Sequence, residues 1–209
     1  MKATQRTGRT VPARFHQGAL LNRALEERGQ PPITFLLGSD HAVGQARLQD
    51  GTVVGLTFPD SWFERTAYLW QQPRTIRFVF VGRFTLGRPK LLHSWKRRDD
   101  VKIVESLWSY NPARKGTYDA TYFGWLGRAE FGLCPHEPEW TASTTNMWTY
   151  RFAECCLAGA IPVQFRATPL GEKFTAGFYY VWDKDATFTF NADAAAANRR
   201  LAEERFRLP

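Results

Sequence analysis

The sequence is poor in cysteine and histidine, which limits the kinds of stabilisation and chemistry open to it. Its cysteines are Cys134, Cys155 and Cys156, and the adjacent pair is badly placed to form a disulfide within itself. Three cysteines do not make a disulfide framework, so the composition favours a reducing compartment. The four histidines are scattered, and no spacing typical of a zinc site occurs. We therefore expect neither a disulfide scaffold nor a bound metal.

Long apolar runs and repeats are also missing. No run of about eighteen apolar residues occurs, so no transmembrane helix is expected. The first residues, MKATQRTGRTVPARF, are basic but lack the apolar segment of a signal peptide. We find no internal repeat and no low-complexity tract. These absences predict a protein that is cytoplasmic or peripheral to a membrane.

The rest of the composition is that of a globular protein with a basic surface. Hydrophobic residues make up 44% of the 209 positions, and sixteen phenylalanines and eight tryptophans provide material for a core. The formal net charge is +8, which favours anionic partners such as phosphates, nucleic acid or an anionic membrane surface. A solvated face is the plainer explanation of the same charges. No nucleic-acid-binding motif occurs, so we expect no nucleic-acid partner.

Apolar periodicity predicts strands that alternate with helices. Helices are expected over 18–28, within 59–70, in part of 89–108, between 115 and 128, and over 147–158 and 193–206. Strands are expected over 33–37, 76–81, 130–134, 161–165 and 178–182. This alternation predicts an α/β fold, a Rossmann-like parallel sheet with helices on both faces. A weak boundary near residue 74 would divide the chain into a partial N-terminal domain with linker, 1–74, and a Rossmann-like domain, 75–209.

The most informative unit is the strand over 130–134 with the loop, helix and strand that follow it. In a parallel crossover the loop and the helix start lie at the carboxyl end of the first strand, where open α/β sheets bind ligands. The loop offers hydroxyl-bearing N-cap residues, among them Ser143, Thr144 and Thr145. Backbone N–H groups at the helix start form an anion site. Ordinary helix capping explains the same residues equally well.

Arg151 and Glu154 lie three residues apart on this helix and therefore share one stripe. Arg151 could hold a phosphate with its planar fork, and Glu154 could accept hydrogen bonds from a ribose diol. On spacing alone, a surface Arg–Glu pair is the better explanation. Gly159 fits a left-handed helix end, and Pro162 is tolerable near the start of a strand.

Two segments, FGLCP and TYRFAECCLAGAIPVQF, resemble motifs of the exostosin-like glycosyltransferases. In that family a strand ends in a proline-containing loop, followed by an Arg-x-x-Glu helix and then Gly-x-Ile-Pro-Val. The matching residues are Phe131 to Pro135, Arg151, Glu154, Gly159, Ile161, Pro162 and Val163. VFVGRF, at 79–84, is similar to the first strand and loop of the same half. The resemblance covers residues 78–182 and is strongest over 131–165.

The resemblance implies a GT-B architecture, in which residues 75–209 form the C-terminal, nucleotide-sugar-binding half. The implied reaction transfers a sugar from a nucleotide-diphosphate-sugar donor to a hydroxyl of a glycan or glycolipid. Neither a metal nor a cofactor is implied, because the helix dipole and arginine take the place of a divalent cation. The basic surface would allow contact with a membrane that carries the acceptor.

The resemblance also assigns residues to the donor site. It implies that Arg151 contacts the donor diphosphate and Glu154 the ribose. Arg83, Pro135 and the loop 143–145 would complete the pocket.

Two departures from the family pattern leave an alternative open. The loop HEPEW lacks the glycine that often follows the proline, and only residues 1–74 precede the donor half. Asp40 or His41, in the segment GSDH, could act as the base that activates an acceptor hydroxyl, although an ordinary turn explains that segment too. The alternative function is a non-catalytic or truncated relative that binds nucleotide sugars.

Overall fold

The computed structural model describes residues 10–11, 16–32, 35–36, 45–47, 53–82, 84, 88–105, 116–135, 150–165 and 174–208. The N-terminal part of the described chain contains α1 (His16–Glu27) and two small antiparallel sheets. One sheet pairs β1 (Thr10–Val11) with β2 (Phe35–Leu36), and the other pairs β3 (Gln45–Arg47) with β4 (Val53–Gly55). Helix α2 (Asp60–Ala67) and a 3-10 helix, η2 (Tyr68–Gln71), lead into the main sheet.

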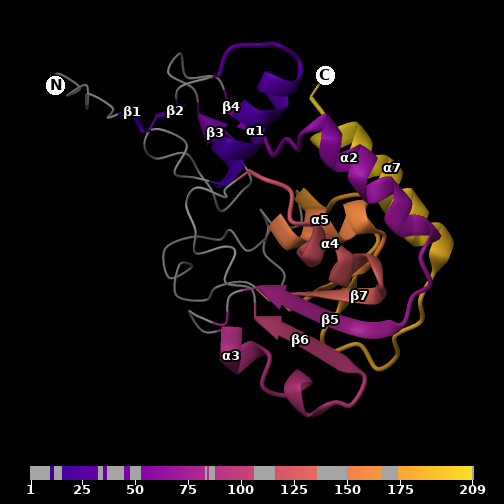
Figure 1. The fold of residues 1–209 in the computed structure, drawn as a ribbon. Helices are drawn as coiled ribbons and strands as arrows, with labels where there is room; N and C mark the ends of the chain where they lie inside the picture. The colour runs from indigo at the N-terminus through magenta and orange to yellow at the C-terminus, as the bar shows by residue number, and fades with distance from the viewer. Residues whose placement is uncertain are drawn as a thin grey trace, which may run out of the picture.

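A parallel sheet forms the centre of the described part of the chain (Figure 1). Its strands are β5 (Ile76–Gly82), β6 (Val101–Glu105), β7 (Ala129–Cys134), β8 (Ile161–Gln164) and β9 (Val181–Trp182). They stand in the order β6-β5-β7-β8-β9, and all pairs are parallel. The predicted α/β fold with a Rossmann-like parallel sheet is therefore confirmed.

Helices cover the two faces of the sheet unequally. On one face lie α4 (Ala120–Gly127) and α5 (Tyr150–Ala158), with α2 and α7 (Ala192–Phe206) beyond them. Val79 and Val81 of β5 belong to the core on this face. Phe78 and Phe80 alternate to the other face, where they share a second core with residues around α3 (Arg88–Leu91) and the 3-10 helix η3 (Trp95–Arg97). Strand β5 is therefore buried on both faces, as its nearly continuous apolar sequence predicts.

The order of the strands creates a switch point between β5 and β7. From β5 the chain passes to β6 by way of α3 and η3 on one face, and it returns to the other side of β5 by way of α4 on the opposite face. Crossovers that leave on opposite faces open a crevice at the carboxyl ends of the two strands. Residues after Gly82 and after Cys134 therefore begin at the place where such sheets bind ligands.

Helix α5 is buried on all sides. It packs between β7 and β8 on one side and α2 and α7 on the other, and every residue from 151 to 158 is buried. Arg151 and Glu154 each expose only 8% of their surface. The surface Arg–Glu pair favoured by spacing alone is therefore wrong, because a second layer of helices covers the side of α5 that faces away from the sheet.

The segment 101–105 departs from the prediction of partial helix over 89–108. In the described part of that range, 89–105, the helical residues belong to α3 and η3, and residues 101–105 form the edge strand β6. Val101, Ile103 and Val104 are β-branched and pack against the two cores, while Lys102 is exposed. β-Branched residues favour strands because their side chains lose rotamer freedom in a helix. Charged residues surround these apolar positions and obscure the strand pattern in the sequence.

The C-terminal end of α5 has the conformation that Gly159 predicts in the sequence. Gly159 has φ +84, and the Ala160 N–H donates to the Cys155 carbonyl at 3.0 Å, as in a left-handed helix end. Pro162 lies opposite Gly132 of β7, and β9 pairs with β8 only from Val163 onward. The proline therefore interrupts no bond to β9.

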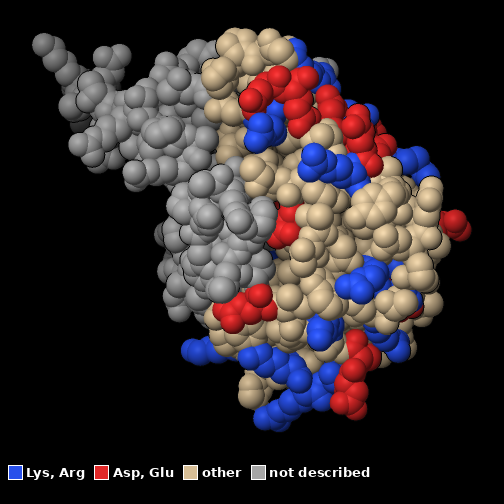
Figure 2. Space-filling model, in the orientation of Figure 1, with Lys and Arg blue, Asp and Glu red and all other residues tan. Residues whose placement is uncertain are grey.

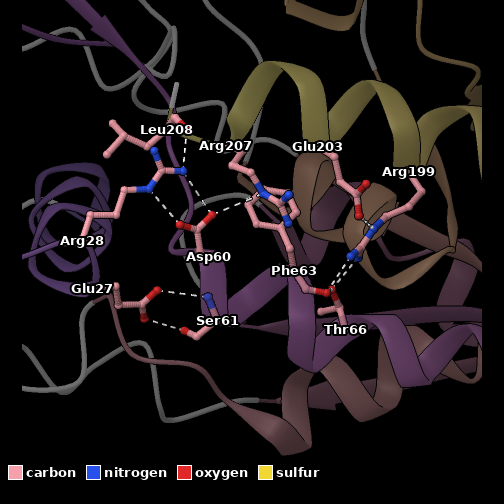
Figure 3. Close-up of polar contacts among 10 residues, drawn as sticks. All are labelled: Glu27, Arg28, Asp60, Ser61, Phe63, Thr66, Arg199, Glu203, Arg207 and Leu208. Atoms are coloured by element: carbon pink, nitrogen blue, oxygen red, sulfur yellow. Dashed lines mark hydrogen bonds and ion pairs between the residues drawn. The ribbon is translucent and has the colours of Figure 1, made fainter.

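Polar contacts connect α1, α2 and the C-terminal residues (Figure 3). Arg28 donates from Nε to Asp60 Oδ2 at 2.8 Å and from Nη2 to the Leu208 carbonyl at 2.7 Å. The Glu27 carboxylate accepts the Ser61 N–H at 3.0 Å in the first turn of α2. Side chains from both sides of the predicted boundary near residue 74 share one core. The division into 1–74 and 75–209 itself stays a prediction.

Candidate functional site

Arg151 occupies the switch point of the sheet. It lies in the first turn of α5 as described, and its Nε donates to the Val81 carbonyl at the end of β5, at 3.0 Å. Its guanidinium carbon lies 4.5 Å from the centre of the Phe80 ring. Helix α5 and the Phe80 ring belong to the cores on opposite faces of the sheet, so the Arg151 side chain crosses the carboxyl end of β5. This is the edge at which open α/β sheets bind ligands.

Gly82 makes room for that crossing. A Cβ atom at this position would collide with Nη2 of Arg151, and the glycine has φ +149. An L-residue with a side chain rarely adopts this backbone conformation. The sequence showed Gly82 as the break after a buried strand, and the structure adds that the guanidinium needs this gap.

One nitrogen of Arg151 lacks a partner. Nη1 is buried and has no hydrogen-bond partner within the described part of the chain. Buried polar atoms are nearly always hydrogen-bonded, so an exception at a sheet edge points to a ligand. Two other largely buried arginines differ in this respect. Arg74 donates to backbone carbonyls at the ends of α4 and α5, and Arg199 donates to carbonyls of α2 and α5.

Glu154 lies one turn further along α5 and contacts α4. Its Oε2 accepts a hydrogen bond from the Tyr122 hydroxyl at 2.5 Å. Tyr122 lies in the first turn of α4, and its backbone N–H donates to Asp119, the N-cap residue of that helix, at 3.0 Å. This bond joins the first turn of α4 to the second turn of α5, one turn beyond Arg151.

The charges of this group are set by burial and by its neighbours. Burial alone would lower the pKa of Arg151, but Tyr122, Cys134 and Glu154 raise it above its ordinary value, so the guanidinium stays charged. Burial, followed by the charge of Glu154, raises the pKa of Tyr122 well above 10. The phenol therefore keeps its proton and acts as the donor to Glu154.

Cysteines line the inner side of the site. Cys134 ends β7, and its Sγ lies 3.9 Å from Sγ of Cys155 on α5. Both thiols are buried, and burial raises the pKa of Cys155 well above its ordinary value. A thiol with a raised pKa is a poor nucleophile, so this pair packs α5 against β7 rather than offering a reactive group.

The structure brings together part of the predicted site. Arg151 and Glu154 lie at the predicted edge, and Pro135 is buried directly after β7. The remaining predicted residues lie outside the described residues: Asp40, His41, Arg83, Ser143, Thr144 and Thr145. Sequence reasoning missed Tyr122, because its partner Glu154 is distant along the chain and nothing local marks the contact.

Within the described ranges no group of three or more His, Cys, Asp or Glu side chains is placed to hold a metal ion. The absence of a metal from the mechanism stays a prediction. None of the helices described here is both long and apolar enough to span a membrane.

Basic side chains gather over α3, η3 and β6, at the lower side of the molecule in Figure 2. Exposed cations in these elements are Lys90, Lys96, Arg97 and Lys102, and Arg98 follows η3 directly. The Arg98 guanidinium is paired with Asp100 at 2.8 Å, which offsets part of the charge. Contact of this surface with a membrane stays a prediction.

Comparison with known proteins gives no family assignment. A scan against protein-family models and a search of curated proteins both found no match to this chain.

Proposed function

We propose that this protein is a glycosyltransferase that takes a sugar from a nucleotide-diphosphate-sugar donor and transfers it to a hydroxyl of a glycan or glycolipid. The observation that carries the proposal is the buried cation Arg151, whose Nη1 has no partner among the described residues, at the switch point of a parallel sheet. The resemblance of residues 131–165 to exostosin-like enzymes supports it and suggests the donor-binding half of a GT-B enzyme.

The donor diphosphate would lie beyond the ends of β5 and β7. There Nη1 of Arg151 would donate to a phosphate oxygen, and the dipole of α5 favours negative charge at its N-terminal end. Glu154 can only accept hydrogen bonds when it is ionised, so its partner on the ligand must be a donor such as a ribose hydroxyl. Arg83, Pro135 and the loop 143–145 belong to the same proposed pocket.

The reaction breaks the bond between the anomeric carbon and the diphosphate oxygen, and forms a bond from that carbon to the acceptor oxygen. The electron pair of the broken bond stays on the diphosphate, which gains negative charge as it leaves. A buried guanidinium already in place stabilises that charge in the transition state. The proton of the acceptor hydroxyl passes to a general base, for which Asp40 and His41 are the proposed residues.

Ligand-dependent thermal stability tests the donor site. A ligand present at about 100 times its Kd stabilises a protein by about 2.7 kcal/mol, so a panel of nucleoside diphosphates should raise Tm. Arg151→Met keeps the length of the side chain but removes its charge, and we expect it to abolish this shift. Arg200→Met, at an exposed position of α7, is the matched control and should retain it. Circular dichroism checks that both variants fold.

If nucleoside diphosphates raise the Tm of Arg151→Met as much as that of the unmodified protein, Arg151 does not bind the donor and the proposed site is wrong. Incubation with nucleotide sugars then separates the enzyme from a non-catalytic relative. The enzyme releases nucleoside diphosphate in the presence of a hydroxyl acceptor, whereas a non-catalytic relative binds the donor without releasing it.

A further inference from the structure

We propose that the side of the molecule around strand β6 docks onto an anionic lipid bilayer. This basic edge consists of Lys90, Lys96, Arg97, Lys102 and Arg128. The inference goes beyond the proposed function, because it concerns the surface on which the protein sits rather than the group that it transfers.

The basic edge surrounds the outermost strand of the sheet, since β6 stands first in the order β6-β5-β7-β8-β9. On one face, Nζ of Lys96 lies 3.7 Å from the centre of the Phe84 ring, which packs against the core around α3 and η3. On the other face the Trp125 ring contacts two cations. Nζ of Lys102 lies 5.6 Å from its centre, and the guanidinium carbon of Arg128 lies 4.5 Å from it. The cations therefore flank β6 on both faces of the sheet.

The charges at this edge are only partly balanced. Residues 90–105 carry five lysines and arginines against three acidic residues. Of the acidic residues, Asp100 is already paired with Arg98 at 2.8 Å. The other four cations of this stretch make no ion pair with any described residue. They remain available to an anionic partner.

Acidic side chains gather at the opposite end of the molecule. Glu26 and Glu27 end α1, and Asp60 and Glu64 lie on α2. Figure 2 shows Asp and Glu at the upper side, where Figure 1 places these two helices, and Lys and Arg at the lower side. An anionic surface attracts the lower side and repels the upper side. This distribution orients the protein with β6 toward the surface.

The chemistry and the shape of the basic edge favour a membrane over a nucleic acid. Cationic heads beside the rings of Phe84 and Trp125 combine an apolar body with a charged tip, which suits the boundary between lipid headgroups and acyl chains. The described atoms at the lower side in Figure 2 form a rounded surface without a groove for a nucleic-acid strand. A few cations near an anionic bilayer give a reversible attachment that salt weakens.

Co-sedimentation with vesicles tests this surface. The vesicles contain phosphatidylcholine with phosphatidylglycerol, and vesicles of phosphatidylcholine alone are the neutral reference. We expect the protein to bind only the anionic vesicles and to be released at high salt. Arg97→Gln combined with Lys102→Gln should weaken binding about thirtyfold, because each cation near the bilayer adds to the attraction.

The matched control is Arg200→Gln combined with Arg205→Gln. It removes the same amount of charge from exposed positions of α7, on the side of the molecule away from β6 (Figure 1). We expect it to bind the anionic vesicles nearly as well as the unmodified protein. Circular dichroism checks that both double variants fold.

Three results would overturn the proposal. The unmodified protein could fail to bind anionic vesicles, or the two double variants could lose binding equally, which would show that net charge and not the basic edge drives the attachment. In the third, an RNA oligonucleotide of mixed sequence binds more tightly than the vesicles at the same ionic strength, measured by fluorescence anisotropy. None of these measurements involves a nucleoside diphosphate, so failure of the donor site and failure of the docking surface are separate results.

Discussion

At the scale of single residues, the site depends on a glycine as much as on the arginine. Arg151 reaches across the end of β5 because Gly82 has no Cβ atom to block its guanidinium. In this position the guanidinium lies against the Val81 carbonyl and the Phe80 ring. A cation fixed in this way loses little further conformational entropy when a ligand binds, which favours affinity.

Substitution of Gly82 should therefore remove the site without changing Arg151. In Gly82→Ala the new methyl group displaces the guanidinium, and the positive φ adds backbone strain of about 1–3 kcal/mol. We expect the Tm shift caused by nucleoside diphosphates to disappear and the free energy of unfolding to fall by a similar amount, measured by urea denaturation. Gly124→Ala is the control, since a Cβ there meets nothing within 4 Å. Full ligand binding by Gly82→Ala would show that the guanidinium does not need its observed position.

The sequence predicts this part of the site only in outline. The shared stripe of Arg151 and Glu154 and the break at Gly82 are local features, and each is visible in the order of the residues. The contact between Tyr122 and Glu154 is not, because it joins two helices through the packing of α4 beside α5. Burial of the pair depends on α2 and α7, whose positions the periodicity of α5 does not reveal.

At the scale of elements, one half-buried arginine, Arg74, caps the C-terminal ends of two helices. Arg74 Nη1 donates to the Gly127 carbonyl at 2.5 Å, and its Nη2 donates to the Ala158 carbonyl at 3.3 Å. These carbonyls belong to the last residues of α4 and α5, which have no partner within their own helices. Burial lowers the pKa of Arg74 to about 10, so it remains charged at neutral pH.

Loss of this arginine should weaken both helix ends at once. Arg74→Met leaves buried carbonyls without a donor, which costs about 1–3 kcal/mol for each unsatisfied group. We expect the free energy of unfolding to fall by about 3 kcal/mol, and hydrogen exchange to rise in the last turns of α4 and α5. Arg77→Met, at an exposed position three residues further on, should change stability far less. Equal losses in the two variants would contradict the proposed capping role.

The sequence predicts the central strands of the sheet and its helices better than it predicts the edge strand. Strands β5, β7 and β8 and helices α4, α5 and α7 follow from periodicity, because each has a long or nearly continuous apolar pattern. The edge strand β6 was missed because it is short, carries charged residues and follows Asp99 and Asp100. An edge strand is exposed on one side, so its sequence need not be apolar.

At the scale of the whole molecule, the first helix and the last residues of the chain meet at the start of α2 (Figure 3). Asp60 is the common acceptor: Arg28 contacts it at 2.8 Å and Arg207 at 3.3 Å. The backbone adds a further link, in which the Phe58 N–H donates to the Phe206 carbonyl at 2.7 Å. These contacts join the N-terminal helix to the layer that covers α5, so they support the burial of Arg151 and Glu154.

This cluster should make stability depend on acid pH. The hydrogen bond from Arg28 lowers the pKa of Asp60 below 3.8, so the folded state binds this proton less readily than the unfolded state. The stabilisation by Asp60 is therefore fully present above pH 3.8 and is lost as the pH falls through the lowered pKa. Because the pairs are partly exposed, Asp60→Asn should cost only about 1 kcal/mol at neutral pH. That difference from the unmodified protein should shrink toward zero in strong acid.

Thermal unfolding between neutral pH and strong acid measures the loss of the stabilisation by Asp60. Glu64→Gln, at an exposed position of the same helix, is the control. The control should follow the unmodified protein more closely than Asp60→Asn does. A constant difference between Asp60→Asn and the unmodified protein down to strong acid would mean that the Asp60 charge does not connect these elements. The attachment of the C-terminal residues to α2 would then depend on the apolar contacts of Phe58 with Trp62 and Phe206. The ring centres of these two residues lie 5.2 Å and 6.0 Å from that of Phe58. Because those contacts carry no titrating group, this alternative predicts no pH dependence from the cluster.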